Sequence, residues 1–540
     1  MGNKLRYLAT VVFALGVLAA PASAQNLRVA LSSEPTSIDP HYHDLSPNNA
    51  LARHVFEALI SADEQQRLVP ALATAWENDG ANRWVFSLRR NVRFSNGQPF
   101  TAADVIYTYC RVLNNETAIA GSFREPLKNI RSIETPDDHT LIVTTTEPEP
   151  LLPSYLSEVA VVSRSITPAA ANLTFASSGN CGFAGPWPTV SVMNEIPMAV
   201  GTGPYRYRTY TRGSAIELVR NESYWGERPA WNEVRFVPVT NAGPRLAGLL
   251  AGDYDLIENP AARDLGRLRN NPRFGFVITP STRIIYLQMD VAREPSPFVR
   301  AEGGRNPLRD LRVRQAINHA IDRGAIVRRI MDEAAQPAAQ YLPNGMFGAL
   351  QDPPPIRYDP ALARRLLAEA GYPNGFALTL HATNDRYIND GQIAQAVAQM
   401  LAQVGIRVEV DAMARSIFFP RRAQREFSFA LGGWGSTPSG ESSSFLRYWV
   451  ASTDREAGLG SSNYGGFSDP EFDRMFRQAI VTVDDARRAE LLRQTVTRAL
   501  EGVPYIPLHF ESSIWAFRAG ITYRGRVDQY TLATSAVPAP

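Results

Sequence analysis

Hydrophobic and polar residues alternate over several short stretches of this 540-residue chain, which is the pattern of half-buried β-strands. Residues 84–88 (Trp-Val-Phe-Ser-Leu) show it most clearly, and residues 27–31 and 377–381 predict two more strands. A tight turn is predicted at Asn96-Gly97. The sequence Thr101-Ala-Ala-Asp104 then predicts the start of a helix, because a threonine N-cap is followed by an acidic residue in the first turn.

Beyond residue 300, hydrophobic positions recur with the period of an α-helix. Residues 313–321 carry their apolar side chains on one helical face. Asp359-Pro360 predicts the N-terminus of another helix, and Asp390 that of a third, which ends at Gly405. Residues 406–410 then predict a strand. Helix followed by strand, repeated in this way, indicates the α/β fold class.

The first 24 residues predict a cleavable signal peptide. Lys4 and Arg6 form a basic region, residues 8–20 are apolar, and Ala22-Ser-Ala24 offers a cleavage site before Gln25. The apolar run is shorter than the ~20 residues that span a membrane, and no cysteine stands at the cleavage site to carry a lipid. We therefore expect a secreted protein that is free in the periplasm.

Charge and length limit the function classes. The whole chain carries a net charge of +2, which the two basic residues of the signal peptide account for. A balanced mature chain argues against nucleic-acid binding, which requires a basic face. Its length predicts at least two lobes. The Ala- and Pro-rich tail after Thr534 is expected to fray.

Cys110 and Cys181 are the only cysteines of the chain. In an oxidising compartment they can form a disulfide, which would constrain the unfolded chain by ~4 kcal/mol on the loop-entropy account. The alternative is two separate thiols, one of them buried. A metal site is not indicated, because neither cysteine lies in a cluster with ligand spacing.

Several motifs resemble those of the periplasmic solute-binding proteins that supply peptides and nickel to ABC importers. They keep the order and spacing of that family, and the resemblance covers nearly the whole mature chain. The motifs are W-x-F-x-L-R with its turn and helix at 84–104, the first ligand-facing loop at 33–40, G-T-G-P-Y at 201–205, R-N-x-x-Y-W at 220–225 and V-R-x-A-x-x-x-A-I-D-R at 313–323. Residues 463–473 (Asn-Tyr-Gly-Gly-Phe-Ser-Asp-Pro-Glu-Phe-Asp) resemble the family's N-Y-x-x-Y-x-N-P-E-F-D.

The resemblance implies a two-lobed Venus-flytrap fold in which the ligand is enclosed between the lobes. Thr279-Pro280 and the segment 504–507 are the expected crossing points, because prolines stiffen short connections. The expected boundaries are 1–24 for the signal peptide, 25–280 for lobe I, about 60–195 for an extra subdomain within it, 281–505 for lobe II, and 506–540 for the return to lobe I and the tail.

The segment that begins at Trp434 is the main candidate for the ligand site. Gly435 permits close backbone approach, while Ser436 and Thr437 supply short donors and acceptors. In the family a tryptophan here is followed closely by an acid that holds a peptide's α-ammonium, but Thr437 occupies the place of that acid. Either Glu441 reaches the ammonium, or the ligand has none. The alternative for the whole segment is a surface turn rich in glycine and serine.

Five further residues complete the candidate site. Arg386, with Asn384 beside it, resembles the family's loop that holds an acidic ligand end; it is predicted to clamp a carboxylate or to be an ordinary surface arginine. Glu34 in the first loop is a candidate partner for a ligand cation. Tyr205 and Tyr286 are candidate aromatic walls, although aromatic residues near strands are also typical of a core.

Motifs of common enzymes are absent from the sequence, including G-x-S-x-G, H-E-x-x-H and a phosphate-binding glycine loop. His41 and His43 lie two residues apart, so they are either one face of a metal site or solvated loop histidines. We predict a monomeric receptor without enzymatic activity or cofactor, which delivers short peptides or peptide-like solutes to an ABC permease. The alternatives are a non-peptide solute such as an oligosaccharide or metal chelate, and, in other classes, a hydrolase or a periplasmic chaperone.

Overall fold

The computed structural model describes residues 26–42, 44–80, 82–115, 123–170, 172–435 and 440–539. The predicted signal peptide lies outside these residues, as do His43, Ser436 and Thr437. In the part of the chain that the structure describes, no helix combines the length and apolar character needed to cross a membrane.

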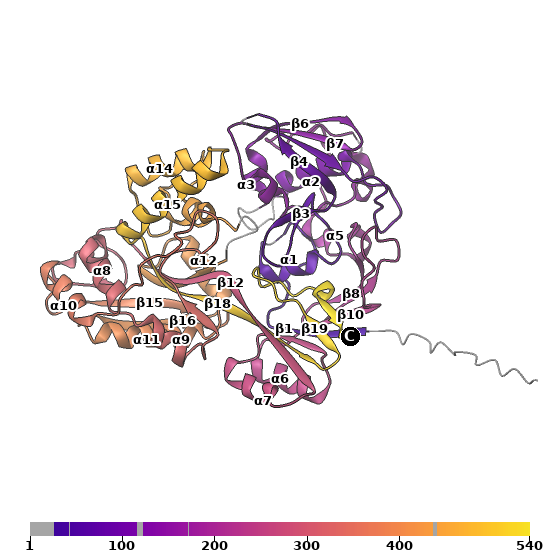
Figure 1. Cartoon of the computed structure of the whole chain (residues 1–540). Helices are drawn as coiled ribbons and strands as arrows, with labels where there is room; N and C mark the ends of the chain where they lie inside the picture. The colour runs from indigo at the N-terminus through magenta and orange to yellow at the C-terminus, as the bar shows by residue number, and fades with distance from the viewer. Residues whose placement is uncertain are drawn as a thin grey trace, which may run out of the picture.

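Two long antiparallel strands, β12 (Phe274–Met289) and β18 (Tyr505–Arg518), run through both lobes and join them (Figure 1). Their pairing is irregular between Pro280 and Ile284 on β12, opposite residues 510–512 of β18. The predicted crossing at Thr279-Pro280 adjoins this irregularity, whereas the predicted second crossing precedes it on β18. The lobe boundaries stay predictions.

Lobe I, as we use the term, contains the sheet half on one side of β18, in the order β18-β11-β1-β10-β9-β8. The predicted first strand is confirmed as β1, which pairs in parallel with β10 and β11. The elements are β1 (Asn26–Leu31), α1 (Ser46–Ala52), β8 (Tyr205–Thr211), β9 (Ala215–Arg220), β10 (Glu233–Pro238), α6 (Ala242–Ala251), β11 (Leu256–Glu258) and α7 (Leu265–Arg269).

An extra four-stranded sheet in the order β4-β5-β7-β6 extends lobe I. The alternation that predicts β5 is confirmed, since Trp84, Phe86 and Leu88 are buried. The helix start is also confirmed: the backbone N–H of Thr101 donates to the Asp104 carboxylate at 3.0 Å. The elements are β2 (Ile60–Ala62), β3 (Leu68–Pro70), β4 (Ala73–Asn78), β5 (Arg83–Leu88), α2 (Ala102–Asn114), α3 (Arg124–Lys128), β6 (Ile130–Asp137), β7 (Thr140–Thr145), α4 (Leu152–Leu156) and α5 (Val190–Met193).

Lobe II contains the other half of the sheet, in which β17 pairs with β12 and β15 lies between β16 and β17. The predicted helices are confirmed; Asp359 caps α10 by accepting from the backbone N–H of Leu362 at 2.9 Å. The elements are β13 (Val299–Arg300), α8 (Leu311–His319), α9 (Arg323–Arg329), β14 (Ala335–Pro337), α10 (Pro360–Glu369), β15 (Ala377–Thr383), α11 (Asp390–Ala402), β16 (Arg407–Met413), α12 (Arg415–Ala423), β17 (Phe429–Trp434), α13 (Ser442–Phe445), a π-helix (Leu446–Val450), α14 (Pro470–Ile480) and α15 (Asp485–Gly502).

The C-terminal tail is ordered, which corrects the expectation that it frays. Strand β20 (Ala536–Pro538) pairs antiparallel with β19 (Ile521–Tyr523). The indole N–H of Trp231 donates to the carbonyl oxygen of Ala536 at 2.7 Å. The tail is held because these contacts come from residues far away in the sequence.

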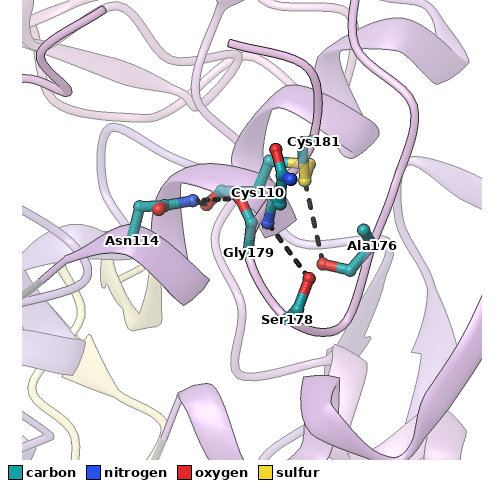
Figure 2. Close-up of a disulfide and its surroundings, with 7 residues drawn as sticks. Cys110, Asn114, Ala176, Ser178, Gly179 and Cys181 are labelled. Carbon is teal, nitrogen blue, oxygen red and sulfur yellow. Dashed lines mark hydrogen bonds between the residues drawn. A yellow bond between two sulfur atoms is a disulfide. The ribbon is translucent and has the colours of Figure 1, made fainter. Parts of the chain in front are cut away.

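Cys110 and Cys181 form a disulfide, the alternative that the sequence left open (Figure 2). Cys110 lies on α2, and both cysteines are buried. Beside the bond, the amide of Asn114 donates to the carbonyl oxygens of Cys110 and Gly179, each at 2.8 Å. The loop that carries Cys181 is thus fastened to α2 by a covalent bond and two hydrogen bonds.

Replacing both cysteines with alanine should lower the free energy of unfolding by about 2–4 kcal/mol, because the disulfide closes a loop with a sequence separation of 71 residues. Urea unfolding of the two proteins measures the difference. A reducing agent should lower the midpoint of the wild type and leave that of the double variant unchanged. Equal midpoints for oxidised and reduced wild type would contradict the prediction.

Candidate ligand-binding site between the lobes

Polar contacts cross from lobe I to lobe II on two sides of the interface. Arg447, on the π-helix, donates to the Tyr155 hydroxyl at 2.9 Å and lies 3.6 Å from the Glu149 carboxylate. Arg415, at the start of α12, donates to the Ser33 hydroxyl at 3.0 Å. Ser33 belongs to the predicted first ligand-facing loop, so this loop faces lobe II.

A cavity of about 600 Å³ opens beside the first of these contacts. Residues of both lobes line it, among them Asn129, Glu149 and Tyr155 from lobe I and Tyr448 and Arg477 from lobe II. The interface between the lobes is therefore hollow at this edge, and polar and charged side chains line the hollow.

Arg447 should hold the lobes together, because its charged hydrogen bond exists only where they meet. In the Arg447→Met protein we expect a larger ligand-free radius of gyration by small-angle X-ray scattering. Apparent affinity should fall by about tenfold, since a charge-assisted hydrogen bond contributes about 1.5 kcal/mol to the closed form. Arg474→Met, on the exposed face of α14, is the control. An unchanged radius together with unchanged affinity would exclude this role.

A charged cluster lies where the two long strands are irregularly paired. Arg283 on β12 is 8% exposed and Glu511 on β18 is 3% exposed. The Nε–H of Arg283 donates to Gln529 at 2.5 Å, and its Nη2 donates to Ser46 at 3.1 Å, both residues of lobe I. Glu511 accepts from the backbone N–H of Ile388, in lobe II, at 3.1 Å. The cluster therefore touches both lobes.

The positive charge of Arg386 shifts the pKa values of Arg283 and Glu511, so Arg386 lies close enough to belong to the same cluster. Burial lowers the pKa of the Arg283 guanidinium, and the positive charge of Arg386 lowers it further, while Glu511 opposes both effects. Burial raises the pKa of Glu511, and Arg283 and Arg386 oppose that rise. We call Arg283, Arg386 and Glu511 the floor cluster.

The loop after β15 holds Arg386 by its backbone. Asp390 accepts from the backbone N–H of Arg386 at 3.1 Å and from the Thr383 hydroxyl at 2.6 Å. Asn389 occupies the N-cap position of α11, which corrects the prediction that Asp390 caps this helix. The Arg386 guanidinium stacks 5.1 Å from the ring of Tyr387 and has no ion pair or side-chain hydrogen bond with any described residue. Its five donors are available to a ligand.

Asn384, in the same loop, is exposed. Its backbone N–H donates to the carbonyl oxygen of Met413 at 3.1 Å, which ties the loop to the end of β16. The side chain of Asn384 remains a candidate ligand contact.

Glu441 is engaged within lobe II. It is 3% exposed and forms a buried ion pair with Arg488 on α15, which also binds Asp485 at 2.6 Å. Burial raises the pKa of Glu441, and the charge of Arg488 opposes the rise. Of the two alternatives that the sequence offered, this favours a ligand without an ammonium at this place, because the Glu441 carboxylate already has a cationic partner.

The end of β17 lies beside the floor cluster. The Tyr387 hydroxyl donates to the carbonyl oxygen of Gly433 at 3.0 Å. A Cβ atom at Gly435 would stand 3.5 Å from Nη2 of Arg283. Trp434 is half-buried and packs edge-on against Phe445, with 5.7 Å between ring centres. Trp434 and Gly435 therefore stay in the proposed site, while Ser436 and Thr437, the next two residues, lie outside the described part.

Three other candidate residues, Tyr205, Tyr286 and Glu34, contact residues of the protein itself. Tyr205 is buried in the core of lobe I. Tyr286 is fully buried, and its hydroxyl accepts from Arg422 at 2.9 Å. The Glu34 carboxylate accepts from the backbone N–H of Gly213 at 2.5 Å. The two tyrosines are core residues and Glu34 fastens the turn between β8 and β9, so we do not count them in the site.

His41 is neither solvated nor a metal ligand. It is 1% exposed, lies 2.7 Å from the carbonyl oxygen of Ala160, and contacts Arg111 at 2.6 Å through its other ring nitrogen. Burial, aided by the charge of Arg111, lowers its pKa to about 4. Among the described residues, no group of three or more His, Cys, Asp or Glu side chains is arranged to hold a metal ion.

Sequence reasoning missed Arg283, Glu511, Arg415 and Arg447. Arg283 and Glu511 had one available signal, since each is an isolated charge among uncharged neighbours near a predicted crossing. Arg415 and Arg447 had none, because their partners Ser33 and Tyr155 are more than 290 residues away along the chain.

Residues 67–457 match the model of the family described as Bacterial extracellular solute-binding proteins, family 5 Middle. The chain belongs to this family. Its two-lobed α/β fold and its role as a solute-binding protein are therefore confirmed.

Relatives cover nearly the whole chain. Heme-binding protein A of Haemophilus influenzae is 27% identical over 85% of this chain and 82% of its own length. Glutathione-binding protein GsiB of Salmonella choleraesuis is 27% identical over 96% of this chain and 95% of its own length. The periplasmic binding protein DppA of Helicobacter pylori, solved with the peptide STSA, superposes with a TM-score of 0.78 at 22% identity, over 95% of this chain and 98% of DppA. The likeness to DppA confirms the fold.

Proposed function

We propose that this protein is the periplasmic substrate-binding component of an ABC importer, which captures short peptides or peptide-like solutes and delivers them to a membrane permease. Family membership supports the receptor role. Relatives that are named for glutathione and for oligopeptides support the peptide class. The signal-peptide pattern of the first 24 residues supports secretion to the periplasm.

The single observation that carries the ligand class is the Arg386 guanidinium. It is partly exposed, belongs to the floor cluster between the lobes, and forms no ion pair with any described acidic residue. A guanidinium in this state binds a carboxylate with two parallel hydrogen bonds. A peptide's C-terminus supplies that group. Because such a ligand contacts both lobes only when they are closed, binding shifts the population toward the closed form.

A second candidate is an acidic solute that is not a peptide. The observation that favours it is the ion pair between Glu441 and Arg488, which removes the acid expected to hold an α-ammonium. A ligand held by its carboxylate alone needs no amino terminus. Non-peptide ligands occur in the family fold, since AgaA, 24% identical with a TM-score of 0.77, was solved with agropinic acid.

Native mass spectrometry of protein purified from the periplasm without refolding tests the proposal. We expect a series of added masses that fit amino-acid compositions. A single mass that fits no peptide would favour the second candidate. Protein without added mass that also gives no calorimetric response to a free-acid tripeptide library would contradict the peptide proposal. A turnover assay with esters and peptides, and an aggregation-suppression assay, test the hydrolase and chaperone alternatives.

A further inference from the structure

Arg283 is a buried cation whose hydrogen bonds go to neutral atoms. It is 8% exposed, and its two side-chain hydrogen bonds to described residues go to the Gln529 amide and the Ser46 hydroxyl. The Glu511 carboxylate lies 3.7 Å from its Nε, too far for a hydrogen bond. A guanidinium has five N–H donors, so three of those on Arg283 have no partner among the described residues. A buried charge normally has its donors satisfied by an acid.

Glu511 cannot supply that acid fully, because it is shared. Its two oxygens accept from the backbone N–H of Ile388 at 3.1 Å and from the Gln529 amide at 3.5 Å. Its charge also interacts with both Arg283 and Arg386. The floor cluster therefore holds two cations and one anion, so one further negative charge would balance it.

The two guanidiniums approach the same part of the interface from different elements, Arg283 from the crossing strand β12 and Arg386 from the loop after β15. Arg283 is fastened to lobe I through Ser46 and Gln529, and it borders Gly435 at the end of β17. Arg386 belongs to lobe II, and its neighbour Tyr387 is hydrogen-bonded to Gly433, two residues before Gly435. An anion near Gly435 is therefore placed to contact Arg386 of lobe II and also Arg283, whose side chain is hydrogen-bonded to lobe I.

We infer that Arg283 is a further ligand-binding residue, which forms with Arg386 a two-guanidinium site for a carboxylate group of the solute. This inference rests on the proposed function and names the chemistry that the receptor selects. A carboxylate between the two cations removes their mutual repulsion and binds lobe I to lobe II. Ligand charge thus drives closure, and acidic ligands are preferred over neutral ligands of the same shape. Gln529 and Ser46 hold Arg283 in position, and Glu511 is the internal carboxylate that competes with the ligand for its charge.

The test compares one tripeptide library in two forms, as free acids and as C-terminal amides, by titration calorimetry. The wild type should bind the free acids more tightly. Arg283→Gln should weaken free-acid binding by roughly tenfold or more and leave amide binding within about twofold, because only the acid carries the charge that Arg283 contacts. Arg283→Lys should keep most of the preference. An equal loss for both forms would overturn the inference, since a merely structural role for Arg283 affects every ligand alike.

Two more measurements keep the inference falsifiable if Arg283→Gln does not fold. Glu511→Gln removes the competing negative charge while it keeps the size of the side chain, so it should increase the ratio of free-acid to amide affinity. A decreased or unchanged ratio would overturn the inference. Arg323→Gln is the matched control, because Arg323 is equally buried in lobe II but donates to Pro507 and Asn318, away from the floor cluster. It should leave the ratio unchanged.

Failure of the peptide proposal can be recognised separately. Glutarate and its diamide are compared by thermal shift in wild type and Arg283→Gln. If neither tripeptide form binds but glutarate alone stabilises the wild type and not the variant, the cargo class is wrong and the carboxylate site stands. If glutarate also fails to stabilise the wild type, the inference is overturned.

Discussion

Arg386→Gln should weaken the binding of a free-acid peptide by about 2 kcal/mol, which is roughly thirtyfold in the dissociation constant. The guanidinium has no described acidic partner, so its charged hydrogen bonds are available to the ligand. Removing the guanidinium should change the free energy of unfolding of the ligand-free protein only slightly, because no internal ion pair is broken. The loss therefore appears in affinity, measured by calorimetry, and not in stability.

Arg407→Gln is the matched control for this variant. Arg407 is an exposed residue on β16 of the same lobe, away from the loop after β15. Arg407→Gln changes the net charge by the same amount as Arg386→Gln, so any effect of overall charge appears in both variants. Equal affinities for the two variants would show that Arg386 does not contact the ligand. A thermal midpoint that falls only for Arg386→Gln would indicate a structural role instead.

Arg111→Met should have the largest effect on stability, a loss of about 3–5 kcal/mol in the free energy of unfolding. Arg111 is 1% exposed and binds Asp39 through both of its terminal nitrogens, at 3.1 and 2.6 Å. The Asp39 side chain is also fully buried. Without the guanidinium, a carboxylate remains buried with no cation, which is more costly than the loss of the pair as a whole.

The double variant Asp39→Asn with Arg111→Met separates these contributions. Because it removes both charges, it should be more stable than Arg111→Met alone, in urea unfolding at pH 7. A double variant that is less stable than Arg111→Met would mean that the buried charge is not the cause. The pair also matters for the site, since it fastens the start of the loop that leads to Ser46, the residue that orients Arg283.

Much of the fold could be predicted from the sequence because the signals act over a few residues. The strand with Trp84, Phe86 and Leu88 follows from side-chain alternation, and the start of α2 follows from the reciprocal contacts of Thr101 and Asp104. Where a signal depends on distant contacts, prediction failed. The composition of the tail after Thr534 indicated fraying, but pairing between β19 and β20 holds it.

The candidate site shows the same division more sharply. The loop with Arg386 and the end of β17 with Trp434 could be proposed from the sequence, because each lies at the end of a strand with a clear pattern. The partners of the charged residues could not be predicted from the sequence. Glu441 was expected to meet a ligand, but Arg488, 47 residues further on, is its partner.

The sequence by itself therefore determined the local elements, the family motifs and the places where the chain turns, since periodicity, caps and turn residues act between near neighbours. Only the tertiary structure decided which charges are paired and which stay available. Arg283 meets Gln529 across 246 residues of chain, and whether any donor remains for a ligand depends on such meetings. Electrostatic pairing depends on distance in space, which no local pattern contains.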